Sequence, residues 1–175
     1  MEKIEIKENV LCNIDRNIQP KGKWVIEHWR KDKLLNVMEI SNLITTEGKN
    51  KILDVMFHGV TQITTWYIGL INDSGFSAVA ATDVMSSHSG WTEFTGYSDS
   101  TRLAWDEAAA SAGAVATNSL TAFSINGTGS IRGMFLTSSN TKSGTTGTLF
   151  NAATFASAQS VLNGDTFRVG YQLSL

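Results

Sequence analysis

The chain has 175 residues, of which 42% are hydrophobic and 17% charged, and its formal net charge is −2. A chain of this length suits one domain and buries about 70% of its unfolded surface, so it needs no disulfide or structural metal to fold. The balanced charge argues against general nucleic-acid binding, which calls for a basic face. The only cysteine, Cys12, excludes an internal disulfide framework and a multi-cysteine metal site.

Membrane insertion and export are not expected either. No window approaches 18 continuous apolar residues, the length that a membrane-spanning helix needs. The first residues, MEKIEIKENVL, mix acids and bases without the continuous apolar stretch of a secretory signal. We therefore expect a protein that is made in a reducing cytoplasm and has no membrane partner.

Residues 1–23 are predicted to form an extended N-terminal arm, and residues 24–175 the folded domain. Ile4 and Ile6 alternate with charged neighbours, as in a short strand, and no sustained period follows them. Such an arm can add a strand to a partner or lie along it, and a flexible or locally packed terminus is the alternative. The predicted partner-binding residues are Ile4, Ile6, Lys7, Arg16, Ile18, Trp24 and Trp29.

Two strand-like runs follow the arm, KWVIEHWR and KLLNVMEISNLI. In the first, Trp24 and Trp29 fall on opposite faces, and large residues on both sides predict a strand that is partly covered on each. The polar connection Lys31-Asp32-Lys33 predicts a hairpin, although it lacks the Asn-Gly or Asp-Gly pair typical of tight hairpins.

Residues 46–58 are the one segment predicted to be helical. Thr45 or Thr46 can cap its first turn, and Gly59 can end it in a left-handed conformation. A helix of about three turns must lie on an apolar surface to be stable, so we expect it to cover an open end or edge of the domain. The expected apolar stripe of the helix consists of Ile52, Leu53 and Met56.

Short strand-like runs continue to the end of the chain at intervals of about ten residues. They are TTWYIGLIND, TRLAWDEA, LTAFSI, SIRGMFLTS, GTLFNAATFA and DTFRVGYQLSL. Asn126-Gly127 and Asn163-Gly164 lie between such runs and predict hairpins. The pattern indicates a mainly β fold, an antiparallel β-sandwich or jelly roll with one short α-helix.

The sequence carries no recognised catalytic or metal-binding pattern. No two histidines show a spacing such as HExxH. Asp106 and Glu107 are adjacent, so in a strand they would point to opposite faces and could not act as an acid/base pair. We predict that the protein is not an enzyme and has no catalytic, cofactor or metal site. A hydrolase using His88, Asp99 and Asp106 is an alternative that only their shared loop-rich stretch supports.

Several segments resemble a family of small virion proteins of tailed bacteriophages. They are IEHWRKDKLLNVMEISNLITTEGKNKILDVMFHGVTQITTWYIGLIN, TRLAWDEAAASAGAVATNS, GMFLTSS and SGTTGTLFNAATFASAQSVLNGDTFRVGYQLSL, and the similarity covers residues 22–175. The resemblance implies a capsid decoration or cement protein on the phage head, made in the host cytoplasm. The implied partners are the major capsid protein and further copies of the chain, as a dimer or trimer. No catalytic residues come with this family.

An alternative keeps the phage context but assigns the protein to the tail or a fibre, as an adhesive module. The Gly/Ser/Thr-rich loops and the five tryptophans would then bind glycans, although tryptophans more often fill a core or a protein interface. The copy number in purified particles separates the two, because a shell protein is abundant and a tail protein is not.

Overall fold

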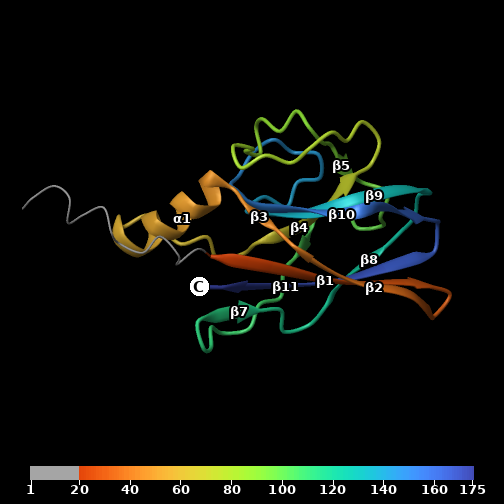
Figure 1. Cartoon of the computed structure of the whole chain (residues 1–175), viewed down its shortest axis with the longest axis horizontal. Coiled ribbons are helices and arrows are strands. Elements are labelled where there is room, and N and C mark those ends of the chain that lie inside the picture. Colours follow the sequence, from red (N-terminus) through yellow and green to blue (C-terminus); the bar gives the residue numbers. More distant parts are fainter. Residues whose placement is uncertain (1–19) are drawn as a thin grey trace, which may run out of the picture.

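The computed structural model describes residues 20–175, which form two antiparallel sheets packed face to face and one helix (Figure 1). This confirms the predicted mainly β sandwich with a single short helix. The predicted arm lies almost wholly outside the described residues. Strand β1 already begins at Lys21, which pairs with Ser174, so residues 21–23 belong to the sheet and not to the arm.

The first sheet has the order β2-β1-β11-β7, and β8 pairs with β11 beside β7. Its strands are β1 (Lys21–Arg30), β2 (Lys33–Ser41), β7 (Ala114–Ala116), β8 (Thr121–Ser124) and β11 (Asp165–Ser174). The β1–β2 hairpin is confirmed. Its two turn residues, Lys31 and Asp32, both have positive φ angles, 45° and 61°. A two-residue turn of this mirror-image type follows the twist of the strands even without glycine.

The second sheet has the order β3-β10-β9-β4-β5, and β6 also pairs with β4. Its strands are β3 (Leu43–Ile44), β4 (Tyr67–Asn72), β5 (Glu93–Phe94), β6 (Leu103–Ala104), β9 (Gly129–Thr137) and β10 (Leu149–Val161). The chain crosses from the first sheet to the second between β2 and β3, where the Asn42 amide donates to the Gly22 carbonyl.

Both predicted Asn-Gly hairpins are wrong. Asn126-Gly127 connects β8 of the first sheet to β9 of the second, and Asn163-Gly164 connects β10 of the second sheet to β11 of the first. Both are turns between strands of different sheets. Turn chemistry therefore located the reversals, but it did not determine which strands pair.

The core lies between the two sheets, where β1 and β11 face β4, β9 and β10. The last strand alternates, and Phe167, Val169 and Tyr171 all belong to this core. A smaller cluster, with Trp91 and Phe135 at its centre, lies under the long connection between β4 and β5.

Helix α1 (Thr46–Phe57) matches the predicted segment closely. The Thr45 hydroxyl accepts the Gly48 amide at 2.9 Å and donates to the Leu149 carbonyl at 2.5 Å, so one side chain caps the helix and attaches it to β10. Gly59, with a φ of 71°, follows the helix end as expected.

The helix covers the sandwich only in part, although it was predicted to cover an open end or edge. Its first turn lies on β10, and its second half projects beyond the sheets (Figure 1). The predicted stripe is also only partly right. Ile52 packs against the core, whereas Leu53 and Met56 are exposed. The docking side consists of Gly48, Ile52 and Val55, at spacings of four and three residues, which lie on one face of a helix.

Candidate interaction surfaces

Five of the predicted partner-binding residues lie outside the described part of the chain: Ile4, Ile6, Lys7, Arg16 and Ile18. Trp24 is a correction. Its side chain is fully buried, its Nε1 donates to Asn151 Oδ1 at 3.2 Å, and its ring lies 4.5 Å from the Tyr171 ring. It is a core residue, and no part of its side chain is available to a partner.

Trp29 lies on the outer face of the first sheet. Its Nε1 donates to Glu27 Oε2 at 2.8 Å, and the Arg168 guanidinium lies 5.0 Å from its ring centroid. These two neighbours fix the orientation of a side chain that is half-buried. Trp29 therefore remains a candidate contact residue, and its nearest cross-strand neighbour is Leu34 of β2.

Strand β2 adds three further exposed apolar side chains beside Trp29. Leu34, Leu35 and Val37 are 40, 43 and 52% exposed. A bulge between His28 and Trp29 leaves Leu35 without a cross-strand partner, because Trp29 pairs with Leu34 and His28 with Asn36. We refer to Trp29, Leu34, Leu35 and Val37 as the β2 edge surface.

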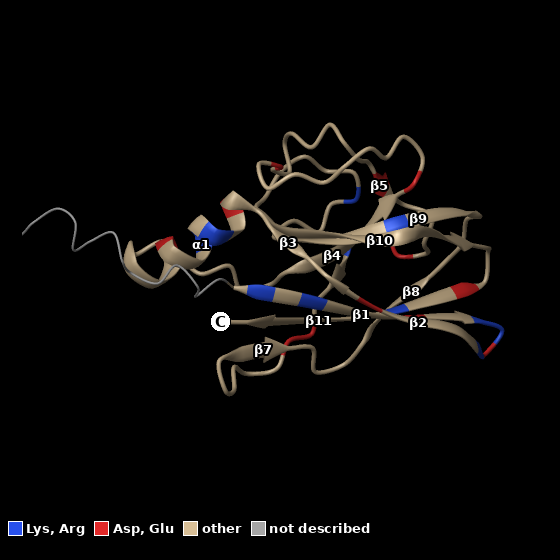
Figure 2. Cartoon of the chain, viewed as in Figure 1, with Lys and Arg blue, Asp and Glu red and all other residues tan. Residues whose placement is uncertain are grey.

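The β2 edge surface also has open backbone groups, because β2 is the outer strand of its sheet and pairs only with β1 in residues 20–175. From Leu34 to Met38 the strand has no charged residue, and the charges gather at the hairpin tip, as Figure 2 shows. Soluble proteins usually protect such edges with charges, proline or a covering segment. An apolar, uncharged edge is the kind of surface that pairs with another chain.

A second exposed apolar surface lies at the other end of β1, on α1. Leu53, Met56 and Phe57 are 54, 68 and 82% exposed and follow one another at spacings of three and one residues. Beside them a groove of about 520 Å³ separates the helix from the sandwich, and it is lined by Met56, Trp66, Phe150 and Leu173 among others.

Two internal clusters contain buried charged groups that pair with each other. In the first, Asp165 accepts from Arg30 Nε at 2.7 Å and Arg30 Nη2 at 2.8 Å, and His28 Nε2 lies 2.9 Å from its Oδ2. The Leu162 amide donates to the same carboxylate at 2.9 Å. Arg30, with the Leu162 amide and His28, holds the pKa of Asp165 well below its ordinary value.

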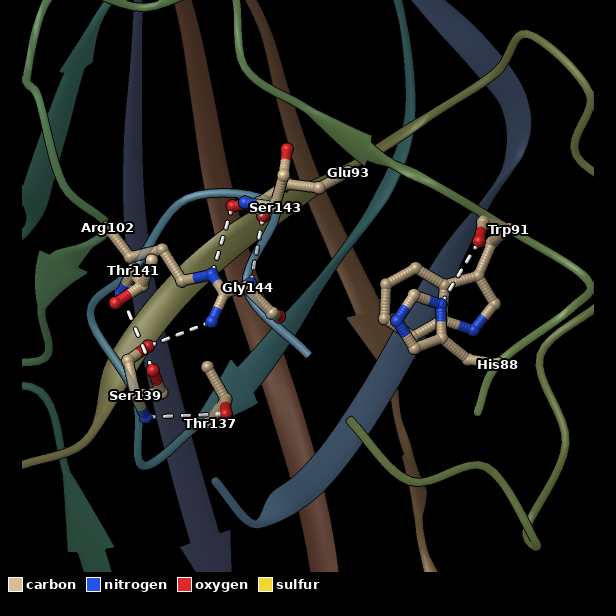
Figure 3. A network of polar contacts seen from close by, with 9 residues as sticks. All are labelled: His88, Trp91, Glu93, Arg102, Thr137, Ser139, Thr141, Ser143 and Gly144. Atoms are coloured by element: carbon tan, nitrogen blue, oxygen red, sulfur yellow. Dashed lines mark hydrogen bonds and ion pairs between the residues drawn. The ribbon is translucent and has the colours of Figure 1, made fainter. Parts of the chain in front are cut away.

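The second cluster centres on Arg102, which is almost fully buried (Figure 3). Arg102 donates to both oxygens of Glu93, at 3.0 and 2.9 Å, and to the carbonyls of Ser139 and Gly144. The Ser143 amide donates to the same Glu93 carboxylate at 2.6 Å. These hydrogen bonds connect β5 to the β9–β10 loop through the buried ion pair.

A small cavity of about 220 Å³ lies between this cluster and His88. The His88 ring stacks on Trp91 with centroids 3.8 Å apart, and its Nδ1 lies 3.1 Å from the Trp91 carbonyl (Figure 3). Asp106, another member of the proposed hydrolase set, accepts from Asn118. No hydrogen bond or ion pair in residues 20–175 joins His88 to Asp99 or Asp106, so the structure does not bring that set together.

Three of the five tryptophans are buried, namely Trp24, Trp91 and Trp105. The two that are partly exposed lie on separate elements, Trp29 on the outer face of β1 and Trp66 in the groove beside α1. A glycan-stacking platform needs aromatic faces side by side and open to solvent, and the described tryptophans do not provide one.

Leu34, Leu35 and Val37 were not among the contact residues predicted from sequence. The signal was available, because Leu34 and Leu35 are adjacent apolar residues that interrupt the alternation of a strand, as happens at a bulge. The predicted stripe of α1 was only partly right, because Leu53 is exposed, and Met56 borders the groove beside the sandwich but is also largely exposed.

Within residues 20–175 no group of three or more His, Cys, Asp or Glu side chains could hold a metal ion. In the same part of the chain no helix combines the length and apolarity that crossing a membrane takes. No protein-family model matches the sequence, and a search of curated proteins found no match.

Proposed function

We propose that the protein is a structural component of a tailed-phage virion, made in the host cytoplasm. It would act as a capsid decoration or cement protein, stabilising the head shell through contacts with the major capsid protein and with copies of itself. The observation that carries this proposal is the β2 edge surface. A protein whose task is contact needs an apolar surface that its own fold leaves open, and Leu34, Leu35 and Val37 with Trp29 provide one.

The rigidity of the sandwich supports the same role. The buried clusters of Asp165 and Arg102 connect segments that are far apart in the chain, for example β1 with the β10–β11 turn. Satisfied networks of this kind restrict a structure to one arrangement. A stiff block with an open apolar edge suits a protein that reinforces a shell.

The recognition mode that fits an open edge strand is strand addition. The outward amides and carbonyls of β2, which have no strand partner in residues 20–175, would bind an extended segment of a neighbouring subunit, and the apolar side chains would select it. The arm residues Ile4, Ile6, Lys7, Arg16 and Ile18 stay a prediction as further partner contacts, because they lie outside the described residues.

The first test is the copy number of the protein in purified particles of the phage that encodes it, measured by quantitative mass spectrometry against the major shell protein. We expect a number comparable to that of the shell protein. A few copies per particle would overturn the decoration role and favour the tail alternative.

The second test uses purified protein and shells that lack it. Val37→Lys places a charge on the β2 edge surface, and Leu162→Lys is the matched control, since Leu162 is 44% exposed but lies in the β10–β11 turn. We expect Val37→Lys to weaken shell binding about tenfold or more, because a buried charge is costly at an interface, and Leu162→Lys to bind normally. Equal binding of the two variants would contradict the assigned surface.

A further inference from the structure

One end of the sandwich combines an apolar groove with a projecting helix. The groove separates α1 from the sandwich, and Trp66, Phe150 and Leu173 line it on the side of the sandwich. The second half of α1 continues beyond the sheets at this end (Figure 1). A hollow and a protrusion therefore lie next to each other in the same molecule.

The projecting half of α1 carries large apolar side chains that the rest of residues 20–175 leaves uncovered. Leu53 and Phe57 are 54 and 82% exposed, and their spacing of four residues makes them neighbours on one face of the helix. Met56, which is 68% exposed, lies beside them and also lines the groove. The protrusion and the groove thus form one continuous apolar surface.

The groove is large enough for side chains of this kind. A cavity of about 150 Å³ in a protein core holds a benzene molecule, so the groove volume of about 520 Å³ accommodates a phenylalanine ring and a leucine side chain together. Among the described residues that line the groove, only Lys51 and Glu107 are charged. An apolar side chain that enters it therefore leaves water for a mainly apolar surrounding, which is favourable.

The whole surface is in the size range of a protein interface. With Val60, which is 37% exposed, the three helix side chains expose on the order of 400 Å² of apolar surface. The lining of the groove adds to this area. A stable interface buries about 800 Å² on each partner, and a contact that covers both the helix and the groove approaches this value.

We propose that a second copy of the chain docks at this end of the sandwich. Under two-fold symmetry, Leu53 and Phe57 of each copy enter the groove of the other, so one contact covers both apolar features in both copies. A two-fold interface uses the same surface patch on each subunit and must be self-complementary, and an apolar protrusion beside an apolar groove meets this condition. A partner with only a protrusion or only a groove would leave the other feature uncovered.

The inference goes beyond the proposed function, because it assigns self-association to α1 and leaves the β2 edge surface available to the shell. The groove lies near Leu173, at the end of β11, whereas the β1–β2 turn lies near Asp165, at its start. The dimer would therefore keep the turn end of both β2 strands away from the contact between the copies.

Sedimentation equilibrium of the full-length protein measures the dimer directly. We expect the wild type to dimerise at micromolar concentration and Phe57→Asp to weaken dimerisation about 100-fold, because a charge must then enter an apolar groove in each half of the dimer. Leu162→Asp is the matched control, since Leu162 is 44% exposed and lies in the β10–β11 turn, away from the groove. It should dimerise like the wild type.

Three results would overturn the proposal. They are a monomeric wild type, a dimer that Phe57→Asp leaves intact, and a dimer that Val37→Lys dissociates, since the last would show that the copies pair through β2. These measurements need no shells. A failure here therefore leaves the copy number in particles as a separate test of the proposed function, and a low copy number would leave the dimer standing.

A mixed disulfide tests which surfaces meet. Leu53→Cys and Ala108→Cys, each in a Cys12→Ser background, place a single thiol on the helix and in the groove lining, respectively. Every disulfide in an equal mixture of the two is then intermolecular, and intact mass identifies the mixed product. With oxidised glutathione we expect this product to form about tenfold faster than the one from Leu53→Cys and Leu162→Cys. Equal rates in the two mixtures would contradict the proposed contact.

Discussion

Asp165 connects three segments of the sandwich through a single carboxylate. It accepts from Arg30, lies within hydrogen-bond distance of His28, and accepts the Leu162 amide at the turn before β11. Its side chain is 1% exposed, so each of these contacts replaces water that the carboxylate lost on folding. Removing one partner of such a buried pair lowers the stability of the fold by more than the pair itself contributes, because the other partner remains buried without a counter-charge.

We expect Asp165→Asn to lower the free energy of unfolding by about 3 kcal/mol at neutral pH, because a neutral amide cannot form an ion pair with the Arg30 guanidinium. The folded-state pKa of Asp165 is depressed, so its contribution is fully present above the ordinary carboxyl pKa of about 3.9. It is lost as the pH falls from there toward the folded-state pKa. Urea titrations should show a large difference between wild type and variant at pH 7 and a smaller one at pH 3; equal differences would contradict the assignment.

At the scale of secondary-structure elements, the attachment of α1 depends on close backbone contact. Gly48 is buried in the first turn, and a Cβ built on it would lie 2.3 Å from the Phe150 carbonyl oxygen. The neighbouring atom belongs to the backbone of β10, so the strand cannot move aside as a flexible side chain would. Glycine is therefore required here for packing, although it weakens the helix itself by about 1 kcal/mol relative to alanine.

Gly48→Ala should consequently destabilise the protein by about 2 kcal/mol, since the helix must shift away from β10. Asn50→Ala is the matched control, because Asn50 is exposed on the same helix and alanine there can only improve helix propensity. Chemical denaturation of the two variants gives the comparison. If Gly48→Ala were as stable as Asn50→Ala, the close contact with Phe150 would not be what holds α1.

The β1–β2 turn is a place where the sequence departs from the residues that its geometry prefers. Lys31 and Asp32 both adopt left-handed backbone conformations, which cost L-residues about 1–2 kcal/mol each. Lys31→Asn combined with Asp32→Gly supplies the pair that this turn favours. We expect the double variant to raise the free energy of unfolding by about 1 kcal/mol, measured as a higher denaturant midpoint with an unchanged slope. A lower midpoint would mean that the turn is not of this type.

At the scale of the whole molecule, the central strands of the first sheet come from distant parts of the chain. β1 pairs with β11 along its entire length, from Lys21 with Ser174 to Arg30 with Asp165. The core side chains Trp24 and Tyr171 meet at this junction. Strand pairing between such distant segments must wait for loop closure, which makes folding slow compared with helical proteins.

A chain that ends at Val161 should therefore fail to fold, because β7 and β8 would lose the strand they pair with and β1 would keep only β2. Circular dichroism and one-dimensional NMR of this truncated chain should show no cooperative unfolding transition. A chain that ends at Ser174 and lacks only Leu175, which is 72% exposed, is the control and should unfold like the full chain. Cooperative unfolding of the first variant would contradict the central role of β11.

The two tryptophans of β1 show which part of the structure could be predicted from sequence and which could not. Alternation correctly placed Trp24 and Trp29 on opposite faces of a strand. It could not tell which face meets the second sheet, so both were assigned to a partner, and Trp24 proved to be core. The Asn-Gly turns show the same limit, because a turn reverses the chain locally whereas pairing depends on which sheet the next strand joins. The exposure of Val37 could not be predicted for the same reason, although the adjacent Leu34 and Leu35 did indicate a bulge.

The sequence by itself determined the class of the fold and the bounds of α1. Strand alternation and the capping of a helix by Thr45 depend on residues a few positions apart, so both can be read along the chain. Only the tertiary structure decided which surfaces stay open in residues 20–175, namely the side of α1 with Leu53, Met56 and Phe57 and the edge of β2. The physical reason is that exposure depends on neighbours brought together from distant parts of the chain, and a local pattern contains no information about them.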